Sequence, residues 1–229
     1  MTDLHPLVLI LAFVISSAFQ TMADETIQFE DAPAAAAPAG WTVAVTGKGT
    51  PSWQVVADPT APSAAQVLQQ SGRADFPLCT RNASSLKNGF VEVTFKPISG
   101  RIDQAAGLVW RFRDADNYYV VRANALEDNV VLYKVEDGRR SALDIVGRKG
   151  GYGLDAKVAN KQWQVLRVEF NEDLFTVFLD TKQLFQVKDA TFQAAGRVGL
   201  WTKADSNTHF DDFSYGEVAN KTGAQKTGL

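Results

Sequence analysis

The chain has very little of the chemistry on which disulfide-rich and zinc-containing proteins depend. Its 229 residues include one cysteine, Cys79, and two histidines, His5 and His209. One cysteine cannot form an internal disulfide, so the stability of the fold must come from its core. A zinc site built from His and Cys ligands is excluded for the same reason. A Cys–His catalytic pair would need Cys79 and His209 to meet, whereas the segment "DFPLCT" predicts a buried, inert cysteine at a strand edge.

The chain also lacks a strong charge of either sign. Lys and Arg total 23 and Asp and Glu total 26, which gives a net charge of −3 and a pI of about 5.4. A balance of this kind is not typical of proteins that bind nucleic acids or anionic membranes. We therefore expect no nucleic-acid partner.

Long hydrophobic runs are confined to the N-terminus. The segment "LVLILAFVISSAF" (7–19) is an apolar run of 13 residues, too short to span a bilayer comfortably. Thr21 and Ala23 then occupy the −3 and −1 positions of a signal-peptidase site, which predicts a signal peptide at 1–23 and a secreted or periplasmic protein. "MTDLHP" has no Lys or Arg, so an uncleaved anchor is the alternative. No Cys follows the run, which excludes lipoprotein processing, and after cleavage we expect no membrane association.

Helical patterns are absent as well. No run of ten or more residues after the leader has helical periodicity, and Pro33 and Pro38 make the Ala/Pro tract at 32–39 an extended connector. Short runs with alternating apolar residues recur instead, separated by turn signals about every 8–12 residues. They predict an all-β, two-sheet antiparallel sandwich of roughly 11–14 strands. We expect a single domain over 24–218 and a disordered tail at 219–229.

Three segments carry a family resemblance: "AAGLVWRFRDADNYYVVRANALEDNVVLYKVEDGRR" (105–140), "LRVEF…FTVFLDTKQLFQV" (166–187) and "GRVGLWTKADSNTHFDDF" (196–213). In this order they resemble the concanavalin A-like (laminin-G-like) jelly rolls, and among these the 3-keto-disaccharide hydrolase or family-16-glycosidase-like group. The resemblance covers about residues 26–217. It implies two packed sheets that bind sugar-type ligands on a concave face or along the edge loops, and function must be argued from residues separately.

Catalysis is one function that the resemblance raises. Family-16-type retaining glycosidases carry an E-x-D-x-x-E-like pattern that places two carboxylates on one strand face. No Glu after the leader has this pattern, so that chemistry is not expected. The alternative, elimination from a 3-keto-glycoside, needs one base and a group that holds an enolate. Glu127 or His209 are the candidate bases, and Arg122, Arg111 or Lys203 the candidate oxyanion partners.

Ligand binding is the other function, and strand parity narrows its candidates. Side chains alternate along a strand, so Arg122 and Asn124 share a polar face, opposite Tyr119, Val121 and Ala123. The same rule places Arg111 and Arg113 opposite Trp110 and Phe112. Arg, Asn, Tyr and carboxylate groups can make directed hydrogen bonds to sugar hydroxyls, although an antiparallel sheet can also simply face water. The candidate ligand-binding residues are Arg111, Arg122, Asn124, Asn129, Trp201, Lys203 and Asp205.

Carboxylates near both ends of the domain suggest a metal. "QFED" (28–31) and "FDDF" (210–213) contain Glu30, Asp31, Asp211 and Asp212. If the first and last strands pair, these hard oxygen ligands suit a structural Ca²⁺. The alternative is that they cap an exposed strand edge.

Three functions remain open at this point. The sequence favours an exported jelly-roll protein that binds a carbohydrate ligand. A lyase or hydrolase acting on 3-keto-glycosides and a non-catalytic envelope protein with a protein-binding face are the alternatives. No organic cofactor is expected, and the sequence does not predict the oligomeric state.

Overall fold

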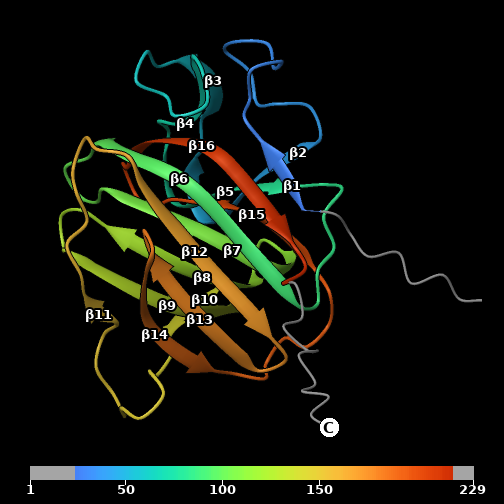
Figure 1. Cartoon of the computed structure of the whole chain (residues 1–229), viewed down its shortest axis with the longest axis vertical. Coiled ribbons are helices and arrows are strands. Elements are labelled where there is room, and N and C mark those ends of the chain that lie inside the picture. The colour runs from blue at the N-terminus through green and yellow to red at the C-terminus, as the bar shows by residue number, and fades with distance from the viewer. Residues whose placement is uncertain (1–23, 219–229) are drawn as a thin grey trace, which may run out of the picture.

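The computed structural model describes residues 24–218, which form two antiparallel sheets packed face to face (Figure 1). The predicted signal peptide and tail lie outside these residues. The first sheet, sheet A, contains in spatial order β14 (Lys182–Lys188), β13 (Leu174–Leu179), β12 (Gln164–Asn171), β6 (Gly89–Ser99), β16 (Asn207–Gly216), β4 (Gln66–Gln70) and β3 (Trp53–Ala57). The short β1 (Glu25–Ile27) pairs with β16, so the first and last strands do meet.

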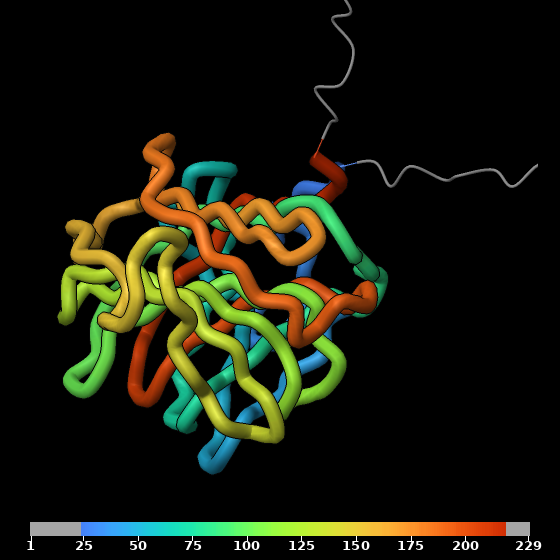
Figure 2. Tube along the Cα trace, turned by 90° about the horizontal axis from the view of Figure 1, so that it is seen from below, coloured from blue at the N-terminus to red at the C-terminus, as the bar shows by residue number. Residues whose placement is uncertain are grey.

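The second sheet, sheet B, has the same size. Its spatial order is β10 (Arg139–Ala142), β9 (Asn129–Glu136), β8 (Asn117–Asn124), β7 (Ala105–Asp114), β15 (Arg197–Trp201), β5 (Arg73–Arg81) and β2 (Trp41–Thr50). The short β11 (Leu154–Asp155) pairs with β9. Figure 2, seen from below, shows sheet A as the upper layer and sheet B as the lower one.

The predicted all-β jelly-roll sandwich is confirmed, with 16 strands among residues 24–218 instead of roughly 11–14. The difference comes partly from short strands of two to four residues, β1, β10 and β11, which are too brief to show alternation. The Ala/Pro connector has no helix, but the prediction that it is extended is wrong, because it turns at residues 34–36 and Ala35 takes φ of 61°. Ala35 and Ala36 exchange backbone hydrogen bonds with Val55 along the edge of β3. Within 24–218 there is no helix long and apolar enough to cross a bilayer.

The space between the sheets is filled by aromatic and branched side chains. Trp110 of sheet B stacks on Tyr119 at 5.4 Å between ring centroids and meets Phe170 and Phe175 of sheet A at 6.0 and 5.3 Å. Cys79 belongs to this core, and its burial raises the pKa of the thiol well above its usual range. An un-ionised, enclosed thiol is a packing group, in agreement with the expectation for "DFPLCT". Its strand, β5, lies inside sheet B between β2 and β15, not at an edge.

A second apolar layer covers the outer face of sheet B. It includes Tyr118, Val120, Tyr133 and Trp201, all almost fully buried. The parity prediction for β8 is therefore right about which residues share a face, since Tyr119 and Val121 lie in the main core. The expected polar character of that outer face is wrong, as is the alternative that it simply faces water, because aromatic rings surround its polar groups.

The parity prediction for β7 is wrong at Arg111. This residue has φ of 47°, and the pairing of β7 with β8 shifts register between Trp110 and Asp114. A bulge of this kind adds one residue to a strand and reverses the alternation beyond it. Trp110 consequently packs in the main core while Phe112 packs in the outer layer of sheet B.

Candidate functional site

The β8–β9 hairpin ends in the group of polar residues on which the site is built. Asn124, the last residue of β8, pairs with Asn129, the first residue of β9, and residues 125–128 connect the two strands. Asp128 takes φ of 47°, and its carboxylate accepts a hydrogen bond from the Val158 amide. Asp and Asn tolerate this left-handed backbone better than most residues, which explains why such a residue closes the loop.

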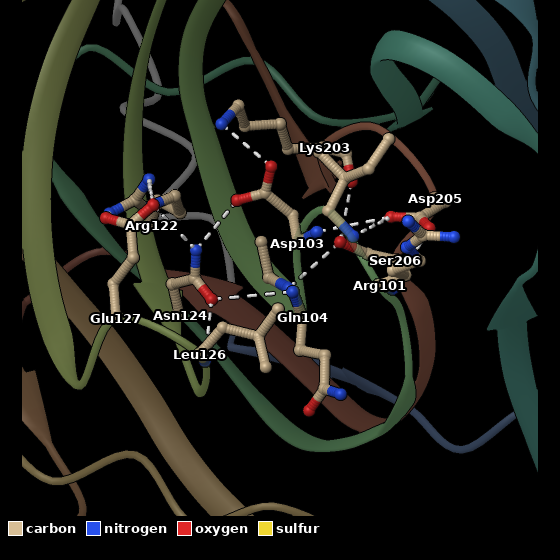
Figure 3. Close-up of polar contacts among 12 residues, drawn as sticks. Arg101, Asp103, Gln104, Arg122, Asn124, Leu126, Glu127, Lys203, Asp205 and Ser206 are labelled. Atoms are coloured by element: carbon tan, nitrogen blue, oxygen red, sulfur yellow. Dashed lines mark hydrogen bonds and ion pairs between the residues drawn. The ribbon is translucent and has the colours of Figure 1, made fainter.

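The Glu127 carboxylate is held by side chains of the hairpin itself, with Arg122 and Asn124 beside it in Figure 3. Arg122 donates to Oε2 at 2.8 Å and to Oε1 at 3.4 Å. Asn129 donates to Oε2 at 3.0 Å and Asn124 to Oε1 at 3.2 Å. Arg122 and Asn124 are completely buried, whereas the Glu127 side chain is 38% exposed. The arrangement fixes the carboxylate and leaves part of it open to solvent.

A second charged pair continues the network toward the β15–β16 loop. Asn124 donates to Asp103 at 2.7 Å, and the buried Asp103 forms an ion pair of 2.7 Å with Lys203. Asp205 accepts hydrogen bonds from the backbone amides of residues 101–103 and so holds the loop that carries Asp103. Figure 3 shows these groups converging from three separate segments. Arg122, Asn124, Glu127, Asn129, Lys203 and Asp205 are therefore brought together.

The charges of this cluster are fixed by their surroundings. Burial alone would raise the pKa of Glu127, but the Arg122 guanidinium outweighs it, and with Asn129 and Lys203 it lowers the pKa below the ordinary value. Burial likewise opposes the charge of Arg122, but Tyr133, Tyr152 and Glu127 outweigh it and raise its pKa. Both groups are thus ionised at neutral pH.

Exposed apolar side chains lie on the loops around the cluster. Tyr152, whose hydroxyl lies 3.4 Å from Arg122 Nη1, is 48% exposed, as is Leu126. Ile102 is 59% exposed and neighbours Asp103 in the chain. Gly153 fixes the turn after Tyr152, because φ there is 64° and a Cβ would collide with the Val130 carbonyl. Polar groups surrounded by apolar ones match the alternating polar and apolar surfaces of a sugar ring.

Arg111, another predicted ligand residue, lies apart from this cluster. The bulge directs its guanidinium toward the space between the two sheets, where its Cζ lies 5.5 Å from the ring centroid of Phe175. There it donates to the backbone carbonyls of Lys87, Phe192 and Glu172 at 3.0, 2.7 and 2.6 Å. Its donors are directed at main-chain carbonyls of three separate loops.

Trp201 is fully buried in the outer layer of sheet B and stacks on Phe76 at 5.6 Å. Gly107 makes room for it, since a Cβ there would lie 3.0 Å from the indole. Trp201 is therefore part of the floor beneath the outer face and has no exposed ring surface of its own.

His209, the other candidate base, lies on the opposite side of the sandwich from Glu127. It projects from the outer face of sheet A, where Nδ1 lies 2.8 Å from Asp58 and Nε2 lies 3.0 Å from the Gln69 amide nitrogen. Burial lowers the pKa of His209, partly offset by Asp58, and Lys96 lowers it further. Both ring nitrogens already have partners, and the main core separates the ring from Glu127.

The four predicted calcium ligands do not converge on one point. Glu30 accepts from the amides of Ala65 and Gln66, Asp212 accepts from Gln28, and Asp31 is exposed. Asp211 accepts from the Ser63 amide and hydroxyl, and the same hydroxyl lies 3.5 Å from Glu30. Across residues 24–218, no group of three or more His, Cys, Asp or Glu side chains is arranged to hold a metal. The calcium site stays a prediction, which a comparison of melting temperatures with and without EDTA would test.

Several solved structures share this architecture. The carbohydrate-binding module CBM66 from Bacillus subtilis superposes with a TM-score of 0.60 at 22% identity, covering 78% of this chain and 96% of that one. The cellulose-induced protein Cip1 gives 0.58 at 14% identity, over 85% and 97% of the two chains. A Bacillus licheniformis β-glucanase gives 0.51 at 12% identity, over 87% and 100%.

The fold is a concanavalin A-like jelly roll. No protein-family model matches the chain, and no curated protein matches it. At these identities the likeness extends to the fold alone, so the narrower resemblance to the 3-keto-disaccharide hydrolase-like group stays a prediction.

Two residues of the cluster have no signal in the sequence. Asp103 lies in the irregular segment "SGRIDQ", and Tyr152 lies in "KGGYG", with no strand periodicity around either. Both join the site only because loops distant in the chain fold over the β8–β9 hairpin. Parity arguments apply within strands and do not reach such residues.

Proposed function

We propose that this protein is an exported carbohydrate-binding jelly roll that holds its ligand at the end of the β8–β9 hairpin. The observation that carries the proposal is the Glu127 carboxylate, held by buried Arg122, Asn124 and Asn129 and partly open to solvent. Sugar hydroxyls are donors that such a fixed acceptor binds without an ordering cost. The fold neighbours, which include a protein named as a carbohydrate-binding module, support this reading.

The remaining groups complete a site for a polyhydroxylated ligand. Lys203, 26% exposed, is a donor on one side of Glu127, and the Tyr152 hydroxyl is a donor on the other. The exposed faces of Tyr152 and Leu126 offer apolar contacts for the C–H face of a sugar ring. Acceptor, donors and apolar surface thus come from one rigid hairpin and two adjoining loops.

The same geometry argues against Glu127 as a general base. A base that acts near neutral pH works best with a pKa close to the working pH. The pKa of Glu127 is instead lowered by Arg122, which stabilises the carboxylate and weakens it as a proton acceptor. Elimination from a 3-keto-glycoside would require that pairing to break, so we favour binding without catalysis.

Glycan-array screening followed by calorimetric titration tests the proposal. Glu127→Gln keeps the shape but removes the charged acceptor and is expected to weaken binding roughly tenfold or more. Glu172→Gln is the matched control, because Glu172 is another loop carboxylate with a lowered pKa, but at the far end of Arg111. His209→Ala is expected to leave binding unchanged.

Two results would contradict the proposal. If no glycan binds, or if Glu127→Gln and Glu172→Gln behave alike, the hairpin end is not a saccharide site. If the protein releases glucose from 3-keto-trehalose and Glu127→Gln abolishes the release, the protein is an enzyme and Glu127 is its base.

A further inference from the structure

One arginine on the outer face of sheet B has aromatic neighbours but no anionic partner. The Arg140 guanidinium lies over the rings of Tyr133, Phe76 and Trp201, at 4.4, 4.7 and 5.8 Å from their centroids. The ion pairs of this face are Arg122–Glu127 and Lys203–Asp103. Arg140 belongs to neither, and its buried Nη1 has no hydrogen-bond acceptor among residues 24–218.

This situation is unusual for a guanidinium that has lost part of its water shell. Aromatic faces attract a cation, but they cannot accept the directed N–H bonds that a planar guanidinium offers. A buried donor without an acceptor is costly, and native structures seldom leave one in place without a reason. Arg140 as a whole is only partly buried, and Nη1 is the one of its guanidinium nitrogens that is enclosed, so an external acceptor can reach the other nitrogens.

The position of Arg140 links it to the Glu127 cluster. Arg122 lies over the same Tyr133 ring, 5.8 Å from its centroid, so the two guanidinium groups flank one side chain. Arg122 is neutralised by Glu127, and its Nε is also buried without an acceptor. Arg122, Tyr133 and Arg140 together form a wall beside the proposed saccharide site. This wall therefore has more positively charged donors than it has acceptors.

We infer that this wall binds an acidic group of the ligand, and that the ligand class is a uronate-containing saccharide. A carboxylate is planar and matches the guanidinium fork, so it would supply the acceptors that Arg140 lacks. Neutral hydroxyls of the same saccharide would meet Glu127 and Lys203. This inference rests on the proposed saccharide site and adds the charge of its ligand.

The test uses a panel of uronate oligosaccharides, each compared with its own methyl ester. The ester keeps the sugar and removes the charge, so the ratio of the two dissociation constants isolates the acid group. We expect the free acid of at least one member to bind tenfold or more tightly than its ester, with a preference that weakens as salt rises. Arg140→Gln should bring the acid down to the affinity of the ester.

Two further variants guard against a merely structural effect. Arg197→Gln is the matched control, because Arg197 also stacks on an aromatic ring of this face, Phe112 at 4.9 Å, but donates to Asn82. It should leave the acid preference intact. Arg140→Lys keeps the charge without the planar fork and should retain part of the preference.

The outcomes separate this inference from the proposed function. Equal binding of every acid and its ester, or an acid preference that survives in Arg140→Gln, would overturn the inference and leave saccharide binding at Glu127 standing. Absence of binding by any saccharide, charged or neutral, would overturn both.

Discussion

Arg111 and Arg122 lie on adjacent strands of one sheet, both almost fully buried, and yet they have different tasks. Arg111 is surrounded by carbonyl oxygens of the main chain, which are neutral and fixed by the fold. Arg122 is surrounded by side-chain oxygens, two of which belong to a carboxylate that is still partly in water. The first arginine joins loops together, and the second holds a carboxylate that is open to solvent. For a buried cation, the nature of its acceptors is more informative than its burial.

The largest effect on stability is expected from Arg111→Met. The substitution removes the donors of three carbonyls, and we expect a loss of about 3 kcal/mol or more in the free energy of unfolding. Urea denaturation measures it, with Arg113→Met as control, because Arg113 stacks on Phe192 but is exposed. Saccharide binding by the folded fraction should not change. A loss no larger than that of the control would show that Arg111 does not join the loops.

Arg122→Met is expected to reduce saccharide binding more than it reduces stability, the opposite of Arg111→Met. Because Glu127 is partly exposed and can regain water, we expect a loss of about 1–2 kcal/mol, less than for Arg111. Saccharide affinity should fall roughly 100-fold, since Glu127 loses its support. Denaturation and titration of the same samples give both numbers. Should Arg122→Met be as unstable as Arg111→Met and still bind the ligand, the division of tasks is wrong.

The pH dependence of binding sharpens the same comparison. Because the folded-state pKa of Glu127 lies below its ordinary 4.5, the carboxylate is charged at pH 5, and wild-type affinity for a neutral saccharide should be equal at pH 7 and about pH 5. It should decline only as the pH falls below 4.5 and through the lowered pKa. Arg111→Met should keep this profile. A wild-type decline that begins above pH 5 would contradict the role of Arg122.

The smallest effect is expected on the far side of the sandwich, at His209. Its lowered pKa means that the unfolded chain takes up the proton first, so stability should begin to fall as the pH drops below about 6.5. Asp58, whose pKa is lowered by Lys96 and His209 despite burial, adds a second decline below 3.8. Denaturation midpoints across this range would show both steps, and His209→Asn should abolish only the first.

Regular strands were predictable from the sequence, and irregular ones were not. Alternation in β8 gave the correct face for Tyr119 and Val121, which lie in the main core, opposite Arg122. The same rule failed in β7, because the bulge at Arg111 places an arginine at positive φ, where the sequence offers no Gly or Asn as a signal. Asp103 and Tyr152 were missed because contacts between distant loops, not periodicity, bring them to the site. Arg140 was missed because its strand, β10, has four residues and is too short to show alternation.

The closing pair Asn124 and Asn129 has a consequence for engineering. These two residues set the register of the hairpin and hold the network, while Leu126 and Glu127 project outward between them. A library randomised at Leu126, with Glu127 kept to neutralise the buried Arg122, would present new chemistry beside an unchanged ion pair and make no demand on the core. Position 126 is thus an exchangeable point at the edge of the proposed saccharide site, where side chains can be varied on one scaffold.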